Sequence, residues 1–317
     1  MTAVHLVTTA GSEDGGGHLS RAIAVAEALT ARHVDVSFEV LRGSPSPGQA
    51  ARLGALGVSI RPPEDNAVIL VDVPDPNEVG DRWPWRRLAA FDDRELLRGP
   101  AALVIQPSLA RWGGSADPTR LLEGSDYAPI RGTLRRLAAE PPPEATPPGV
   151  LVCFGGSDPA DVGARLVPAI AAAGPWPTVA VVGPGYRGAL DRTDDDVEGD
   201  VRVVRDPADL DRRLATARVV VAGAGTLKFE LALLGRPSIL LAVADDQLPV
   251  GPPFAETGAA LYLGDGRTIE LAAVGEAVAA LMGDEPARVA MASRGREVVD
   301  GRGADRIAVA LVELAAT

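Results

Sequence analysis

The sequence predicts an α/β protein made of two doubly wound domains, and two observations carry this prediction. Short apolar runs that end in small or polar residues alternate with segments whose apolar residues recur at helical spacing. Near the middle of the chain the stretch AAEPPPEATPPG (138–149) interrupts this alternation, and a second alternating series follows it. Strands that alternate with helices predict a mostly parallel sheet flanked by helices. At 317 residues the chain also exceeds what one hydrophobic core usually holds.

The first series opens with a βαβ unit. A buried strand is expected at 3–9, a helix at 19–32 and a second strand at 34–41. Further strands are expected at 57–60, 67–73, 88–93 and 102–107. We therefore assign residues 1–140 to an N-terminal domain and the prolines of 141–149 to an extended linker.

The second series fills residues 150–317, which we assign to a C-terminal domain. Its strands are expected at 150–156, 178–183, 201–206, 218–225 and 238–244. Helices are expected between them, for example at 226–235. Open parallel sheets bind ligands at the carboxyl ends of their strands, so functional residues are expected in the loops at these ends.

Composition excludes several classes of function. The formal charge of −12 disfavours nucleic acid as a partner, because an acidic chain repels a phosphate backbone. One cysteine and three scattered histidines give no metal-ligand spacing, so we expect no metal and no cofactor. The start of the chain lacks a basic signal-peptide region, and the longest apolar runs are too short to span a bilayer. We expect a cytoplasmic protein, monomeric or weakly dimeric.

One histidine stands at the start of the first helix. In GSEDGGGHLSRAIAVAEAL (11–29) three glycines, including Gly16 and Gly17, precede His18. Glycines let backbone N–H groups approach a ligand, and a helix N-terminus favours anions. The same end disfavours a charged imidazole, so His18 is expected to be neutral and able to accept a proton. The alternative is an ordinary tight turn.

Three further loops follow strands in the second series. FGGSDP (154–159) offers the N–H groups of Gly155, Gly156 and Ser157 to a phosphate, or else Ser157 and Asp158 simply cap a helix. AGAGTLKFE (222–230) places Gly225 and Thr226 at a helix start, with Glu230 one turn inside. A carboxylate there can accept hydrogen bonds from ribose hydroxyls, or else it only complements the helix dipole. In VADDQLP (243–249) Gln247 could reach a base or sugar, unless this is a plain polar loop.

Carboxylates also end strands of the first series, at Asp72 and at Asp92–Asp93. They could orient His18, ligate a metal or cap a helix. Arg21, one turn into the first helix, could pair with a phosphate or with Asp93. The chain has no G-x-x-x-x-G-K-[ST] motif, which excludes a P-loop, and no G-x-G-x-x-G follows the first strand.

In their order along the chain, these motifs resemble the nucleotide-sugar hydrolase of the pseudaminic acid pathway and its spore-coat-polysaccharide relatives. These proteins in turn look like the GT-B glycosyltransferases that make lipid II. The segments that carry the resemblance are GGGHLSR (15–21), VD (71–72), FDD (91–93), SDYAPIR (125–131), CFGGSDP (153–159) and VAGAGTLKFELALLGRPSILL (221–241), with Gln247 after them.

The resemblance implies two Rossmann-like, doubly wound parallel-sheet domains in a GT-B-like arrangement with an interdomain cleft. It implies that a UDP-sugar or related nucleotide sugar is held by Gly155, Gly156, Ser157, Gly225, Thr226, Glu230 and Gln247. On the N-terminal side Gly16, Gly17, Arg21 and Tyr127 would contact substrate. His18, with Asp14, Asp72 or Asp93 to orient it or the substrate, would direct water to the anomeric carbon and release the nucleoside diphosphate. No metal is required in that scheme.

The chain departs from the family pattern on the sugar side. Pro74 in VDVPDP stands where an aromatic residue that contacts the sugar is expected, and GTLRR follows SDYAPIR in place of Pro-Glu-Phe-like residues. Three functions are therefore weighed. The first is a nucleotide-sugar hydrolase, and the second a glycosyltransferase that uses the same donor site with an organic acceptor. The third is a nucleotide-sugar binding protein without catalysis.

Overall fold

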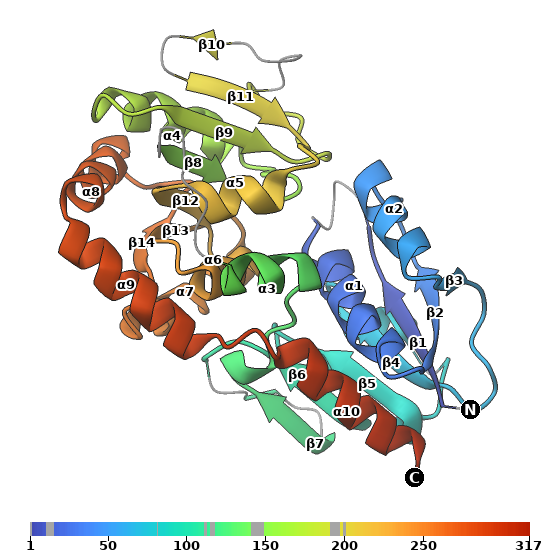
Figure 1. Ribbon diagram of the computed structural model, residues 1–317. Helices are drawn as coiled ribbons and strands as arrows, with labels where there is room; N and C mark the ends of the chain where they lie inside the picture. Colours follow the sequence, from blue (N-terminus) through green and yellow to red (C-terminus); the bar gives the residue numbers. More distant parts are fainter. Residues whose placement is uncertain are drawn as a thin grey trace. The chain divides into compact units, whose positions relative to one another are not determined.

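The computed structural model describes residues 2–10, 16–80, 82–110, 113–114, 118–140, 149–190, 197–198 and 201–317. The chain divides into two compact units (Figure 1). Unit 1 comprises residues 1–132 and 301–317, and unit 2 comprises residues 133–300. Of the expected linker 141–149, only Gly149 lies within the described residues.

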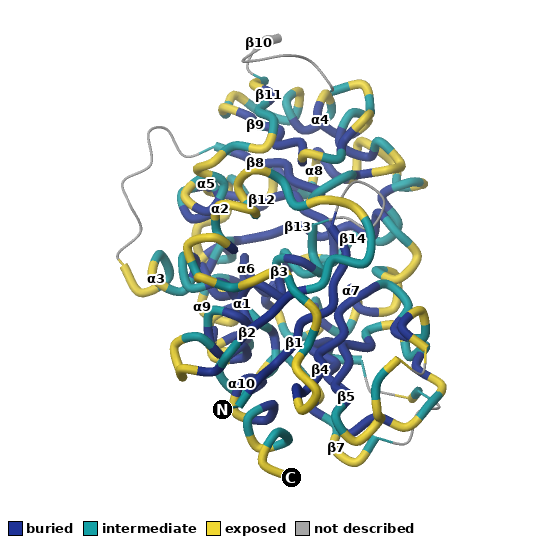
Figure 2. Tube along the Cα trace, turned by 90° about the vertical axis from the view of Figure 1, so that its right-hand side faces the viewer, coloured by how far each residue is buried: buried dark blue, intermediate teal, exposed yellow. Residues whose placement is uncertain are grey.

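Unit 1 is built on a parallel sheet whose described strands run in the order β3-β2-β1-β4-β5-β6-β7. The strands are β1 (Ala3–Thr8), β2 (Asp35–Val40), β3 (Ser59–Ile60), β4 (Val68–Asp72), β5 (Leu88–Phe91), β6 (Ala101–Gln106) and β7 (Pro118–Glu123). Every residue of β1, β4 and β5 is buried, and Figure 2 shows these strands in dark blue. Burial on both faces explains why they are continuous apolar runs rather than alternating ones.

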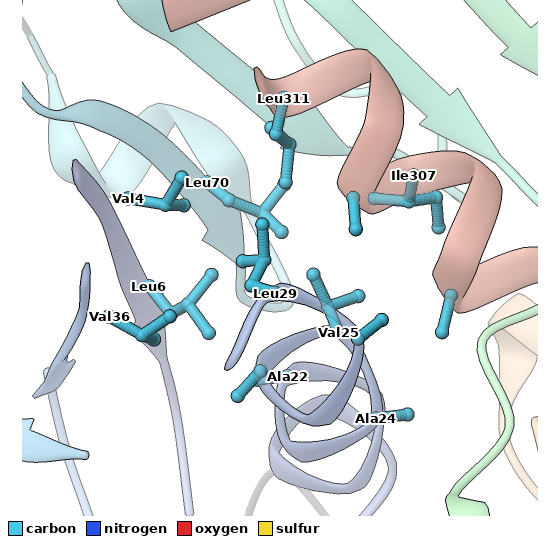
Figure 3. Close-up of a cluster of buried hydrophobic side chains, with 14 of the residues drawn as sticks. Val4, Leu6, Ala22, Ala24, Val25, Leu29, Val36, Leu70, Ile307 and Leu311 are labelled. Atoms are coloured by element: carbon cyan, nitrogen blue, oxygen red, sulfur yellow. The ribbon is translucent and has the colours of Figure 1, made fainter. Parts of the chain in front are cut away.

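One face of this sheet is covered by two helices from opposite ends of the chain. Helix α1 (Gly17–Thr30) and helix α10 (Gly303–Ala315) share a hydrophobic cluster with β1, β2 and β4. Figure 3 shows Val25 and Leu29 of α1 beside Ile307 and Leu311 of α10. The last helix thus completes the core of unit 1, whereas the sequence expectation grouped all of 150–317 in one domain.

The remaining described elements of unit 1 are short. They are α2 (Pro47–Ala55), the single-turn 3₁₀ helices η1 (Pro76–Val79), η2 (Trp85–Arg87) and η3 (Ser125–Tyr127), and the first residue of α3 (Gly132–Ala139). Helix α2 begins with a capping box, in which Ser46 and Gln49 bond each other's main-chain N–H groups.

Unit 2 repeats the architecture with the strand order β10-β11-β9-β8-β12-β13-β14 among the described residues. The strands are β8 (Val150–Cys153), β9 (Thr178–Val182), β10 (Val197–Glu198), β11 (Val201–Arg205), β12 (Val219–Gly223), β13 (Ser238–Ala242) and β14 (Leu261–Asp265). All described pairs are parallel except β10 with β11. The helices are α4 (Val162–Ala172), α5 (Leu210–Thr216), α6 (Leu227–Leu234), η4 (Asp245–Gln247), α7 (Gly251–Glu256), α8 (Leu271–Gly283) and α9 (Glu285–Val298).

The predicted fold class is confirmed: both units are parallel-sheet α/β structures. The expected strands form, except that Asp92 and Asp93 lie beyond the end of β5. The sequence reasoning missed β7, β10 and β14. Strand β7 reads PTRLLE, lies at a sheet edge and has one buried residue, so it lacks the continuous apolar signal of the central strands. Among the described residues, no helix is both long and apolar enough to cross a membrane.

Replacing Leu311 by alanine should destabilise unit 1, because the Leu311 side chain is fully buried between α10, α1 and the sheet. We expect the free energy of unfolding to fall by about 2–5 kcal/mol, the usual cost of a leucine-sized cavity. Urea denaturation measures it. The matched control is Val309→Ala on the same helix, where the side chain is 43% exposed. A change of about 0.5 kcal/mol or less is expected there, and equal effects of the two substitutions would contradict the assignment of α10 to the core.

Candidate active site

A buried ion pair lies at the carboxyl end of the unit 1 sheet. Asp72 is the last residue of β4 and is 1% exposed, and Arg21 lies one turn into α1. Arg21 donates two parallel hydrogen bonds to Asp72, from Nε to Oδ2 (3.0 Å) and from Nη2 to Oδ1 (2.5 Å). Strand β1 precedes α1 and pairs directly with β4, with Thr8 opposite Asp72. The connection from β1 to α1 therefore places Arg21 beside Asp72 at the carboxyl end of the sheet.

Neighbouring charges outweigh the effect of burial on the pKa values of Asp72 and Arg21. Burial opposes ionisation of Asp72, but the Arg21 guanidinium and His18 outweigh it and hold the pKa of Asp72 below its ordinary value. Burial likewise opposes the charge on Arg21, but Asp72 and Asp93 raise the pKa of Arg21 above its ordinary value. The guanidinium also lies over the Phe91 ring, 4.6 Å from its centre. Asp72 is thus a carboxylate and Arg21 a cation throughout the physiological range.

His18 completes the arrangement, because its Nδ1 lies 2.7 Å from Asp72 Oδ1. Arg21 Nη2 lies 3.2 Å from the same nitrogen. Because a carboxylate only accepts, the hydrogen bond to Asp72 requires a proton on Nδ1, and in the neutral ring the lone pair is then on Nε2. The His18 side chain is 20% exposed, so Nε2 can meet a ligand. An imidazole held in one tautomer by a buried carboxylate can accept a proton, with the division of roles found in a Ser-His-Asp triad.

The neighbouring carboxylates do different work. Asp93 accepts from Arg21 Nη1 and its side chain is 33% exposed. Asp92 is buried and accepts from the main-chain N–H groups of Leu96 and Leu97, so it holds its own loop rather than His18. Burial raises the pKa of Asp92 above its ordinary value, although these two N–H groups act in the opposite direction.

The glycines that precede His18 lie only partly within the described residues. Gly16 is the N-cap of α1 and Gly17 its first residue, while residues 11–15 fall outside the described chain. Gly16 has no side chain to cap the helix, so the first N–H groups of α1 receive no side-chain cap from that position.

In unit 2 the three predicted loops meet at one sheet edge. Strands β8, β12 and β13 are adjacent and parallel, so the loops that follow them lie side by side. Gly155 has a φ of +90°, a backbone conformation that favours glycine. Gly156 lies close to Gly183, whose added Cβ would be 2.4 Å from the Gly156 carbonyl oxygen. The loop 155–157 is therefore held by its backbone against the loop after β9.

The helix expected directly after FGGSDP starts later than predicted. Helix α4 begins at Val162, and the Asp158 carboxylate accepts from the N–H groups of Val162 (3.0 Å) and Gly163 (2.7 Å). Asp158 thus occupies the helix N-terminus that an anion would otherwise use. A phosphate at this loop would have to use the N–H groups of 155–157 instead.

The second and third loops are in contact. A Cβ added at Gly223 would lie 3.4 Å from Gln247 Oε1, and one added at Gly225 would lie 3.4 Å from Gln247 Nε2. Gln247 also accepts from the N–H of Val243 at 3.2 Å, which fixes its side chain across the glycines. Thr226 is the N-cap of α6 and gives it no side-chain cap, while Glu230 is 9% exposed in the first turn.

Two residues of this site escaped the sequence reasoning. Lys228 is 4% exposed, and its ammonium donates to the carbonyls of Ala224 (2.9 Å) and Gly225 (3.1 Å), which ties the glycine turn to α6. A lone lysine in the apolar helix TLKFELALL was the available signal. Burial raises the pKa of Cys153 to about 11, assisted by the charge of Glu230, so this thiol is no nucleophile at neutral pH.

Tyr127 belongs to the core of unit 1. It ends η3 after the edge strand β7, and it packs partly buried against the cluster that α1 shares with the sheet. Among the described residues, no group of three His, Cys, Asp or Glu side chains is placed to hold a metal ion.

Two curated proteins match part of the sequence. A UDP-N-acetylglucosamine–N-acetylmuramyl-(pentapeptide) pyrophosphoryl-undecaprenol N-acetylglucosamine transferase of Rhodopseudomonas palustris is 34% identical over 211 residues, 59% of this chain and 53% of that protein. The spore coat polysaccharide biosynthesis protein SpsG of Bacillus subtilis is 24% identical over 204 residues, 62% of this chain and 59% of that protein. The match therefore spans just over half the length of these relatives. No protein-family model matches the chain.

Solved structures match over nearly the whole chain at low identity. MurG of Acinetobacter baumannii superposes with a TM-score of 0.59 at 14% identity, covering 99% of this chain and 100% of that one. A glycosyltransferase of Rickettsia africae gives a TM-score of 0.64 at 10% identity and covers 100% of both chains. The fold is therefore that of the GT-B glycosyltransferases, and the resemblance inferred from the sequence motifs is confirmed.

The substitution Asp72→Asn should destabilise the protein and change its acid sensitivity. It leaves the buried Arg21 with one carboxylate fewer, which typically costs about 3–5 kcal/mol. The depressed pKa of Asp72 means that its ionised form stabilises the fold above the unfolded pKa of about 3.9, and this stability is lost as the pH falls through the folded value. Urea denaturation should show a smaller loss below about pH 4 for Asp72→Asn than for the wild type.

The matched control is Asp35→Asn, because Asp35 pairs with Arg61 through a side chain that is 34% exposed. A surface pair of this kind contributes about 0–1 kcal/mol. If Asp72→Asn costs no more than Asp35→Asn, the buried pair does not carry the stability assigned to it.

Proposed function

We propose that the protein is a glycosyltransferase that takes a sugar from a nucleoside diphosphate sugar and transfers it to a hydroxyl acceptor. The observation that carries the proposal is the His18–Asp72–Arg21 arrangement, a base of fixed tautomer on a GT-B fold. The relative named for its activity transfers N-acetylglucosamine from a UDP-sugar. That match favours transfer over the hydrolysis expected from the sequence.

The nucleotide is assigned to unit 2. The N–H groups of 155–157 and of Gly225 and Thr226 are offered to the diphosphate, at the carboxyl ends of adjacent strands. Glu230, in the first turn of α6, is offered to the ribose hydroxyls. Main-chain donors suit this task in an acidic protein, since they bind an anion without requiring lysines or arginines.

The chemical step is assigned to unit 1. Nε2 of His18 takes the proton of the acceptor hydroxyl, whose oxygen attacks the anomeric carbon while the bond from that carbon to the diphosphate oxygen breaks. Asp72 stabilises the imidazolium that forms, and Arg21 keeps Asp72 in place without touching substrate. Arg21 is therefore a positioning residue here, not the phosphate ligand that was one of its two sequence-based alternatives. Proton transfer of this kind contributes about 10²–10⁴-fold to a rate.

Glu230→Gln should weaken UDP binding at least tenfold if the carboxylate accepts from the ribose. Titration calorimetry with UDP and with 2′,3′-dideoxyuridine diphosphate forms a double-mutant cycle. Removing the ribose hydroxyls from the ligand should weaken its binding to the wild type as much as Glu230→Gln weakens the binding of UDP. For the variant, removing those hydroxyls should weaken binding little further. Glu276→Ala, at an exposed position of α8, is the control. Additive losses would contradict the contact, and undetectable UDP binding by the wild type would contradict the donor site.

His18→Asn should lower sugar transfer at least 100-fold and leave UDP affinity unchanged. UDP release from UDP-N-acetylglucosamine is measured with and without an acceptor. The acceptor is the undecaprenol pyrophosphoryl muramyl lipid after which the Rhodopseudomonas relative is named. The control is His33→Asn, because His33 is exposed and has a φ of +58° that asparagine tolerates. Equal release of UDP without acceptor would establish hydrolysis instead. Full turnover by His18→Asn would contradict the role of His18 as the base.

A further inference from the structure

A second site in unit 2 lies at the opposite end of the strands from the nucleotide loops. A cavity of about 700 Å³ is bounded by the residues that precede β12 and β13 and by one side of α9. The two strands have five residues each, so about 16 Å of chain separates this cavity from the loops at their carboxyl ends. The volume falls within the range of about 300–1,000 Å³ typical of small-molecule sites.

Four arginines line this cavity, with two glutamates. Arg218 precedes β12, Arg236 follows α6, and Arg288 and Arg296 come from α9. The glutamates are Glu285 and Glu297, and Glu297 is engaged by Arg294 at 2.7 Å. The lining therefore carries an excess of positive charge in a chain whose formal net charge is −12.

The partners of these arginines are main-chain carbonyls. Arg288 donates to the carbonyls of Leu281 (2.7 Å) and Met282 (2.6 Å), and both Arg236 (3.2 Å) and Arg296 (3.3 Å) donate to that of Leu234. Within the described part of the chain, no ion pair at 4.0 Å or less joins any of the four to a carboxylate. A guanidinium has five N–H donors. Arg218 and Arg296 are exposed and can turn most of theirs to a ligand, whereas Arg288 is 7% exposed and contributes its charge.

Two pairs of these arginines repel each other, Arg236 with Arg296 and Arg288 with Arg218. Burial lowers the pKa of Arg236, and the charge of Arg296 lowers it further. Burial likewise lowers the pKa of Arg288, with Arg218 adding to the effect and Glu285 and Asp284 opposing it. Gly235 makes room for this crowding: its φ is +61°, and an added Cβ would lie 2.5 Å from the central guanidinium carbon of Arg296. Repulsion between neighbouring cations is reduced when an anion binds among them.

We propose that this cavity binds a soluble oligophosphate, an anion with at least two linked phosphate groups. Guanidinium groups bind phosphate oxygens through paired hydrogen bonds, and several of them converge here. Because Glu297 is paired with Arg294, four arginines face one remaining glutamate, Glu285, an excess of three positive charges. A single phosphate group carries only about 1.5–2 negative charges, so two linked phosphates match this excess better than one does. The site is separate from the nucleotide loops and stands whether or not the chain transfers a sugar.

Titration calorimetry with pyrophosphate tests the proposal on the whole protein. The double variant Arg218→Gln/Arg296→Gln removes two exposed guanidiniums and should bind pyrophosphate at least tenfold more weakly than the wild type. Arg218→Gln alone should weaken binding about threefold, which keeps the test open if the double variant does not fold. Inorganic phosphate should bind the wild type more weakly than pyrophosphate does.

Two variants separate this site from its surroundings. Arg202→Gln also removes one positive charge, at an exposed position of β11 three strands from β12, and should leave pyrophosphate affinity unchanged. Glu230→Gln alters the proposed nucleotide site and should also leave it unchanged. Pyrophosphate binding that survives the double variant, or that is absent from the wild type, would overturn the proposal.

Discussion

The buried pairing of Arg21 with Asp72 is the interaction on which the polar site of unit 1 depends. An unpaired charge at either position would cost several kcal/mol, so each residue requires the other. Two parallel hydrogen bonds fix the carboxylate, and the carboxylate then fixes the tautomer of His18. The βαβ crossover supplies this geometry, because β1 and β4 are neighbours and α1 begins at the carboxyl edge that they share.

The two candidate sites are built by different physical means. Unit 1 places charged side chains around His18, whereas the proposed nucleotide site of unit 2 consists of main-chain donors on glycine turns. Side chains of unit 2 hold those turns: Lys228 donates to the carbonyls of one turn, Gln247 lies across its glycines, and Asp158 caps α4. The cavity at the opposite end of the same strands is lined by side-chain cations instead.

The fold was largely predictable because buried parallel strands are continuous apolar runs, as in β4 and β13. What failed were features that depend on partners distant in sequence. Helix α10 reads as part of the C-terminal series, yet its buried face matches α1 across the whole chain. The site was predictable only in part. Orienting His18 was one of three roles that the sequence left open for Asp72 and Asp93, and the choice of Asp72 as the histidine's partner needed the strand register. Helix capping by Asp158 was one of two alternatives for its loop, and choosing it needed the start of α4 at Val162, whose N–H donates to that carboxylate.

The central claim is that Asp72 holds His18 with a proton on Nδ1 and a free lone pair on Nε2. Nitrogen-15 NMR of histidine-labelled protein measures this directly, because the chain has three histidines and the His18 signals are identified by their loss in His18→Asn. At a pH where the ring is neutral, the account predicts a protonated Nδ1 and an unprotonated Nε2 for His18. A His18 ring that carries its proton on Nε2 would contradict it.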